Sequence, residues 1–158
     1  MSSTKEIAKH FREIYFGKNW TGSNLKDNLE GMTWQQATTE VHSLNTILAL
    51  VYHINYYVRI MLVVLEGGLL EGSDKYSFNH PTISSQHDWE QFLNTIYTDA
   101  ETFANLIEQL PEKKLWEDFS GEKYGHFHRN LIGVIEHSYY HLGQIVLIKR
   151  LLNNHKNL

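Results

Sequence analysis

Apolar residues recur every three or four positions through most of the chain, which is the period of an amphipathic helix. We expect four long helices from this pattern, over residues 5–16, 43–66, 86–110 and 127–152. Runs of alternating apolar and polar residues, which indicate strands, are nearly absent. The pattern therefore predicts an all-α fold in which four long helices form a bundle.

Residues with capping preferences set the expected ends of the helices. Ser3 and Glu6 match a capping box, in which the serine side chain accepts a hydrogen bond from the helix backbone, and Gly17 suits the position just past a helix end. A continuous helix from Trp34 to residue 66 would fit the apolar pattern. Ser43 and the threonines before it favour a boundary, however, because their side chains compete for backbone hydrogen bonds. We therefore expect a short helix from Trp34 and a new one from Ser43.

Composition adds limits to this interpretation. A chain of 158 residues is long enough for one domain with a proper core. The first residues lack the apolar segment of a signal peptide, and we expect a soluble cytoplasmic protein that spans no membrane. The net charge of −4 argues against a nucleic-acid surface. The chain contains no cysteine, which excludes disulfides, thiolate ligands and a cysteine nucleophile.

The most suggestive chemistry lies in the last helix, where His137 and His141 are four residues apart. On a helix this spacing puts both side chains on one face, where two imidazoles can bind one metal ion. Ten histidines in a chain of this length produce about 0.6 such pairs by chance, so the spacing alone is weak. A metal site needs a third ligand from another element.

Three other histidines are candidates for that ligand. His126 shares the face of His137 but lies about 16 Å along the helix, and His128 is about half a turn out of phase. His53 sits deep within the apolar helix over residues 43–66. If that helix is the neighbour of the last one, His53 meets His137 and His141 in the middle of the bundle. Three neutral imidazoles would leave coordination positions open, as catalytic sites do.

Ordinary structural roles remain open for the same residues. A single buried histidine such as His53 is more often a core residue than a ligand. The tyrosines around the three histidines are first of all core and interface residues. Glu136 and Arg59 would by default be solvated.

Residues 50–53 read Leu-Val-Tyr-His, and residues 137–145 read His-Ser-Tyr-Tyr-His-Leu-Gly-Gln-Ile. With the Trp-Thr-Gly turn at residues 20–22 and the order of the helices, they resemble the DinB-like superfamily, named after DNA-damage-inducible bacterial proteins. The resemblance covers most of the chain, and His-x-x-x-His-x-Gly-Gln is its most specific part. It implies a single DinB-like domain over residues 1–158, folded as a four-helix bundle with a crossover connection. It also implies a divalent metal ion, zinc or nickel, bound by His53, His137 and His141.

The better-understood relatives in this superfamily are transferases and isomerases that use low-molecular-weight thiols such as bacillithiol or mycothiol. The resemblance therefore implies a metal-dependent thiol S-transferase acting on a small-molecule electrophile. Because the chain has no cysteine, that thiol must arrive as a cosubstrate. A metal-dependent hydrolase and a non-catalytic, stress-related metal- or ligand-binding bundle remain alternatives.

Two tyrosines are candidate catalytic residues beside the expected metal. Tyr57 lies one turn beyond His53, and Tyr140 directly precedes His141. Either could orient a substrate or give a proton, although packing would also explain both.

The chain is also expected to form a homodimer. Aromatic residues make up 13% of the sequence, more than one small bundle usually needs. The resemblance adds that family members often pair through helix faces.

Overall fold

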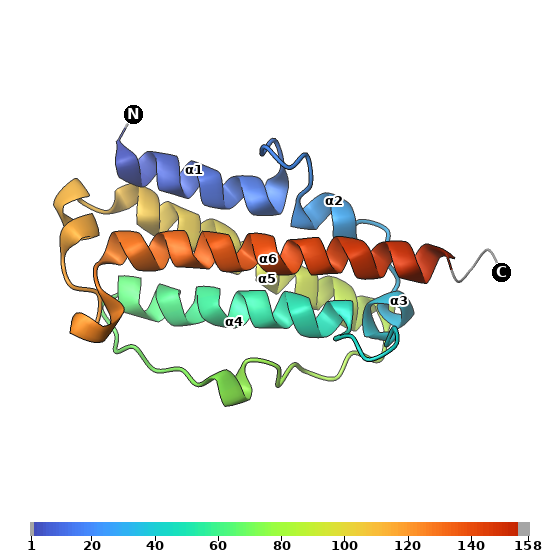
Figure 1. Cartoon of the computed structure of the whole chain (residues 1–158). Coiled ribbons are helices and arrows are strands. Elements are labelled where there is room, and N and C mark those ends of the chain that lie inside the picture. Colours follow the sequence, from blue (N-terminus) through green and yellow to red (C-terminus); the bar gives the residue numbers. More distant parts are fainter. Residues whose placement is uncertain (1, 155–158) are drawn as a thin grey trace.

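The computed structural model describes residues 2–154, and these residues form an all-α fold (Figure 1). Within this range the only β-type pairing is an isolated bridge between Asp118 and His126. The predicted all-α class is therefore confirmed. The α-helices are α1 (Ser3–Phe16), α2 (Leu25–Leu29), α3 (Trp34–Thr38), α4 (Ile47–Leu65), α5 (Gln86–Gln109) and α6 (Phe127–Asn154), and the short 3₁₀ helices are η1 (Asp74–Tyr76), η2 (Glu112–Trp116) and η3 (Glu122–Tyr124).

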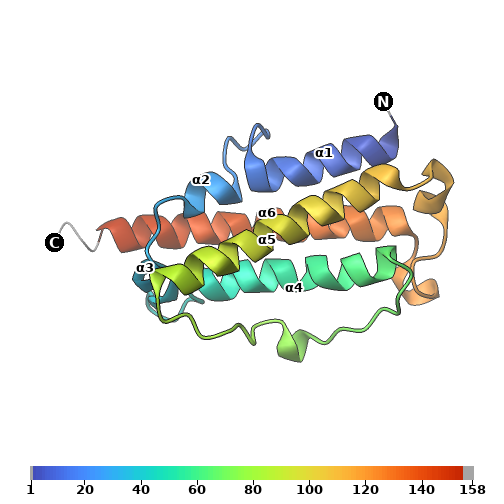
Figure 2. The ribbon, with the colours of Figure 1, turned by 180° about the vertical axis from the view of Figure 1, so that it is seen from behind.

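The four long helices lie against one another in pairs. α1 contacts α5 and α6, and α4 contacts the same two helices. Figures 1 and 2 show α6 running beside α4 over most of their lengths, with α5 crossing behind them in the first view. The neighbourhood of α4 and α6, on which the expected histidine site depends, is therefore present.

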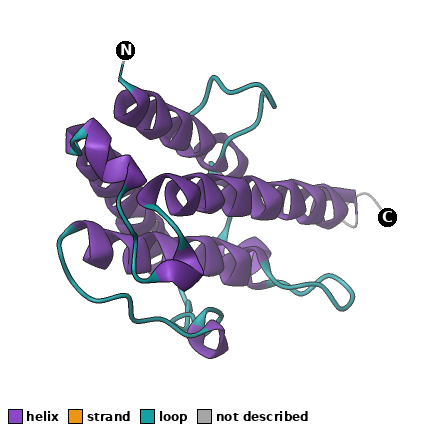
Figure 3. Ribbon diagram, turned by 60° about the vertical axis from the view of Figure 1, so that its left-hand side comes forward, coloured by secondary structure: helices purple, strands orange, loops and turns teal. Residues whose placement is uncertain are grey.

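Two long connections complete the fold. The segment between α1 and α4 contains α2 and α3. The segment between α4 and α5, residues 66–85, returns along the outer side of α4 and carries η1 (Figures 1 and 3). Because this 66–85 loop returns along α4, the helices α4 and α5 run in the same direction. The loop is thus placed to cover one side of α4.

The buried apolar residues of the described chain form one continuous cluster. α4 is its most apolar element, with a mean hydropathy of 1.7, and is long enough to cross a membrane. Of this helix, however, 61% is buried inside the fold. Burial of that extent fits the core helix of a soluble protein.

Two predicted helix starts were wrong by a few residues. α4 begins at Ile47, and the side chain of Thr46 rather than Ser43 accepts the capping hydrogen bond from Ala49 N. A turn, closed by a hydrogen bond from Leu44 N to Val41 O, occupies the segment where the helix was expected to start. The predicted break after α3 is nevertheless confirmed.

At the N-terminus, the side chain of Ser2 rather than Ser3 caps α1. The predicted role of Gly17 is confirmed, because it follows α1 directly with φ of 113°, a conformation that L side chains rarely adopt.

Candidate metal centre

His53 on α4 and His137 and His141 on α6 converge on one point. The Nε2 atom of His137 lies 3.1 Å from Nε2 of His53 and 3.1 Å from Nε2 of His141. His53 and His141 are each only 8% exposed. One ligand atom from each ring lies within 4.8 Å of the others, so the three residues could hold a metal ion. No other group of His, Asp or Glu in the described chain has this arrangement.

The two helices explain this convergence. His137 and His141 are one turn apart on α6, which places their rings on the same face with centroids 4.5 Å apart. His53 approaches from α4, with its centroid 4.9 Å from that of His137 and 4.7 Å from that of His141. Rigid helices fix all three side chains, so little local rearrangement is needed to present three nitrogens together.

The outer nitrogens of two rings face oxygen atoms. His53 Nδ1 lies 3.3 Å from the backbone carbonyl of Ser77, and His141 Nδ1 lies 2.6 Å from Gln144 Oε1. A carbonyl oxygen only accepts hydrogen bonds, so each Nδ1 carries the proton and donates it. In the neutral ring the other nitrogen then has no proton. The Nε2 atoms of His53 and His141 therefore point bare lone pairs toward His137.

With these protons assigned, the cluster has too few N–H donors to make a hydrogen bond in both contacts of His137. His137 Nε2 carries at most one proton, so only one of its two 3.1 Å contacts can be an ordinary hydrogen bond. If His137 Nε2 carries a proton, the other contact leaves a bare lone pair without a donor, and if it carries none, both contacts place lone pairs against each other. His137 Nδ1 is itself buried and has no hydrogen-bond partner among residues 2–154. A cation bound by the three Nε2 atoms would remove the lone-pair repulsion, so the residues present fit a metal ion.

A proton on one of the three rings would be another source of positive charge, but the surroundings of the rings disfavour it. Burial, and then the proximity of His141 and His53, lower the pKa of His137 to about 4. Burial also lowers the pKa of His53 and His141. All three rings are thus neutral near pH 7, which is the form that binds metals.

Tyr57 also lies at this cluster. Its ring centroid is 4.8 Å from that of His137 and 5.2 Å from that of His53. Its hydroxyl donates a hydrogen bond to Asp74 Oδ1 at 2.5 Å. Burial, and then the bond to Asp74, raise the pKa of Tyr57 to about 12, so the hydroxyl keeps its proton at neutral pH.

The 66–85 loop supplies this carboxylate and covers one side of the site. Phe78 stacks on His53 with ring centroids 4.0 Å apart, and the Tyr56 hydroxyl bonds to the backbone N–H and C=O of Ser73. A Cβ atom at Gly72 would meet the end of the Ile60 side chain, which would have to shift, so glycine leaves room for both where the loop lies against α4. The loop is thus held against the helix that carries His53.

A cleft of about 590 Å³ opens beside the histidines, and we call it the histidine cleft. Tyr57, His137 and Asp74 line one part of it. Lys123 and Arg129 are the cationic residues of its lining. A small molecule in this cleft could therefore reach an ion bound by His137.

Tyr140, the second expected catalytic residue, lies elsewhere. It is 66% exposed, and its ring contacts His141 from outside with centroids 4.9 Å apart. It does not line the histidine cleft. The structure thus brings Tyr57 to the three histidines and leaves Tyr140 on the surface.

Sequence reasoning missed three contributors to the site. Gln144 follows His141 by three residues, a helical spacing that could have identified it. Asp74 and Ser77 reach the site only through the path of the 66–85 loop, and they have no periodic signal.

No family model, no curated protein and no solved structure matches the chain. The residues of the site itself are therefore the basis for its chemistry.

Proposed function

We propose that the protein binds a divalent metal ion, zinc or nickel, at His53, His137 and His141 and uses it to catalyse a reaction of a small molecule. The observation that carries the proposal is the convergence of three Nε2 atoms while the Nδ1 atoms of two rings donate to carbonyl oxygens. A structural site is usually closed by four protein ligands. A site of three histidines, of which His137 lines an open cleft, is instead typical of a catalytic site.

The metal ligands, the Tyr57–Asp74 pair and the cationic residues of the histidine cleft would have different roles in the reaction. When bound to three neutral imidazoles, a divalent ion supplies positive charge that lowers the pKa of an adjacent water or thiol. The Tyr57 hydroxyl is held by Asp74 at the edge of the cleft, where it can pass a proton to that carboxylate. Lys123 and Arg129 would favour a substrate or cosubstrate with an acidic group.

The preferred reaction is S-transfer with a low-molecular-weight thiol. The sulfur of the thiol forms a bond to an electrophilic carbon, and the leaving group departs from that carbon with its bonding electrons. The proton of the thiol passes to Asp74 by way of the Tyr57 hydroxyl. The thiol comes from solution, because the chain has no cysteine.

The same proposal assigns the chain to the DinB-like superfamily. The four long helices and the return of the 66–85 loop along α4 support a four-helix bundle with a crossover connection. A homodimer and a cytoplasmic location belong to this assignment. Exposed Trp20, Tyr140 and Leu147 offer apolar surface for pairing.

The test uses a thiol and an electrophile whose product absorbs light, such as 2-mercaptoethanol with 1-chloro-2,4-dinitrobenzene. Zinc- or nickel-loaded protein should accelerate product formation over the metal-free protein, and Tyr57→Phe should lower the rate about 10²-fold. Tyr76→Phe, on an exposed residue, is the matched control. Full metal binding without acceleration for a panel of thiols and electrophiles would instead favour the non-catalytic alternative.

A further inference from the structure

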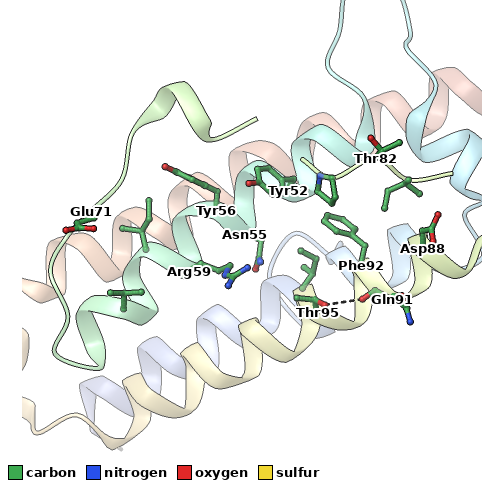
Figure 4. Close-up of a pocket in the computed structure, with 15 residues that line it drawn as sticks. Tyr52, Asn55, Tyr56, Arg59, Glu71, Thr82, Asp88, Gln91, Phe92 and Thr95 are labelled. Atoms are coloured by element: carbon green, nitrogen blue, oxygen red, sulfur yellow. Dashed lines mark hydrogen bonds between the residues drawn. The ribbon is translucent and has the colours of Figure 1, made fainter. Parts of the chain in front are cut away.

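The 66–85 loop rests on α4 through few buried residues. Of its residues, all of which the structure describes, only Ser77 and Ile83 are buried. Glu71 and residues 81–83 line a cleft of about 650 Å³ between α4 and α5, so packed side chains do not fill the space beside the loop there (Figure 4). A segment with few buried apolar contacts opens locally at a low free-energy cost. The closed position of the loop therefore depends on a small set of polar and ring contacts.

One turn of this loop, residues 73–78, contacts a metal ligand. The carbonyl of Ser77 accepts the hydrogen bond from His53 Nδ1 at 3.3 Å, and Phe78 stacks on the same imidazole with the ring planes 8° apart. Ser77 is itself only 1% exposed. The 73–78 turn therefore holds the His53 ring while its Nε2 atom faces the other two histidines.

The same turn holds Tyr57 at the histidine cleft. Asp74 Oδ1 accepts a hydrogen bond from the Tyr57 hydroxyl, and both residues line the cleft. The Ser77 hydroxyl donates to the backbone carbonyl of Asp74 at 2.8 Å, and the Ser77 N–H donates to that carbonyl at 3.1 Å. Ser77 therefore joins the group that faces His53 to the group that faces Tyr57, so opening of the turn would remove both.

Metal binding by His53 would strengthen its contact with the turn. The Nδ1–H of a metal-bound imidazole is a stronger donor than that of a free one, so its hydrogen bond to the Ser77 carbonyl becomes charge-assisted. Because linkage is reciprocal, the factor by which the closed turn raises metal affinity is the factor by which the metal favours closure. Hydrogen-bond partners of metal ligands change the affinity about 10- to 100-fold. Opening of the turn should become rarer by a similar factor.

We propose that the 73–78 turn is a strap that metal binding locks in place, with Ser77 and Phe78 as positioning residues. This inference rests on the proposed metal site and on no particular reaction there. In the metal-free chain the turn opens more often, and Asp74 then leaves Tyr57. In the loaded chain the turn stays closed, so this wall of the histidine cleft is kept in place mainly when the ion is bound.

Amide hydrogen exchange of the wild-type chain, followed by NMR with and without zinc, tests this coupling. The reporters are the N–H groups of Tyr76 and Ser77, which donate hydrogen bonds within the turn. Their exchange should slow about 10- to 100-fold when zinc binds. The N–H of Gly22, which donates to the Asn19 carbonyl in the turn after α1, is the internal control and should exchange at the same rate in both samples.

Two pairs of variants test the positioning residues. Phe78→Ala should weaken zinc binding about tenfold, and Phe78→Tyr, which keeps the ring, should restore it. Tyr76→Ala, at another exposed aromatic residue of the turn, should bind zinc as the wild type does. Ser77→Ala should weaken zinc binding about fivefold. Ser84→Ala, which removes a hydroxyl of the same loop that bonds to Asp88, is its control.

The possible failures are distinguishable. Binding of one zinc ion per chain with unchanged exchange of the turn amides would overturn the strap and leave the metal site standing. No zinc binding by the wild type would overturn both. Equal zinc affinities of Phe78→Ala, Ser77→Ala and the wild type would also overturn the proposal, because the turn would then not position His53.

Discussion

The contact between α1 and α5 and the contact between α4 and α6 solve the same packing problem with different residues. In the first, Phe11 and Phe103 are fully buried and meet edge to face with centroids 4.8 Å apart. In the second, His53, His137 and His141 occupy a comparable place between two long helices. The first contact is complete as an apolar surface, whereas the second brings together ring nitrogens that could bind a metal ion.

The aromatic contact therefore serves mainly the stability of the fold, whereas the histidine contact serves mainly the proposed metal chemistry. Burial of aromatic rings stabilises the fold through lost apolar surface and specific ring contacts. The three imidazoles, two of them buried and that of His137 partly buried, stabilise nothing comparable without a metal, because their nitrogens lose water and gain incomplete hydrogen bonding. Substitutions in the aromatic contact should therefore mainly lower the free energy of unfolding. Substitutions in the histidine contact should mainly lower metal affinity.

The largest expected effect is in the aromatic contact. Phe103→Ala should lower the free energy of unfolding by about 3–5 kcal/mol, since it leaves a cavity beside Phe11. Denaturant titration of the metal-free protein measures this loss. Tyr76→Ala, at an exposed residue, is the control and should cost less than about 1 kcal/mol. A similar small loss for Phe103→Ala would remove the distinction between the two contacts.

A smaller effect is expected from Gln144, which accepts the hydrogen bond from His141 Nδ1. Gln144→Met should weaken zinc binding about 10- to 100-fold, because the ring loses the group that orients it. Competition with a chromophoric chelator measures the affinity. Gln109→Met, at an exposed position of α5, should bind zinc as the wild type does. If both variants kept full affinity, His141 would not depend on this bond.

The smallest effect concerns pH. Burial lowers the pKa of His137 to about 4 from an ordinary value of 6.5, so between these values the unfolded chain takes up a proton that the folded chain does not. The free energy of unfolding of the metal-free protein should therefore fall as pH drops from 6.5 to 4. Allowing for the partial exposure of His137, we expect a loss of about 1–2 kcal/mol.

Denaturant titrations at several pH values in the presence of a chelator measure this loss. His137→Gln should show a smaller dependence in this range, and His87→Gln, on an exposed residue of α5, should match the wild type. An unchanged slope in His137→Gln would mean that this ring is not responsible.

The helices and the three histidines were within reach of sequence reasoning because their signals are local. The apolar period revealed the long helices, and the spacing of His137 and His141 placed both on one face. His53 followed from its depth in an apolar helix. The start of α4 was misplaced at Ser43, because the choice between two hydroxyl caps depends on a turn that buries Val41.

The rest of the site depends on tertiary structure. Asp74 and Ser77 belong to a loop whose path is set by contacts with Tyr56 and Tyr57, and no period in the sequence reports such contacts. The position of Tyr140 next to His141 suggested a shared site. Adjacent helical residues point about 100° apart, however, and Tyr140 lies on the exposed side of α6.

The most direct test of the metal centre is metal analysis of three proteins purified side by side without metal-affinity resin. These are the wild type, His137→Ala and the control His87→Ala, each incubated with zinc or nickel and then freed of unbound ion. We expect about one ion per chain in the wild type and the control, and less than about a tenth of that in His137→Ala. Equal metal content in all three proteins, or none in the wild type, would contradict the account.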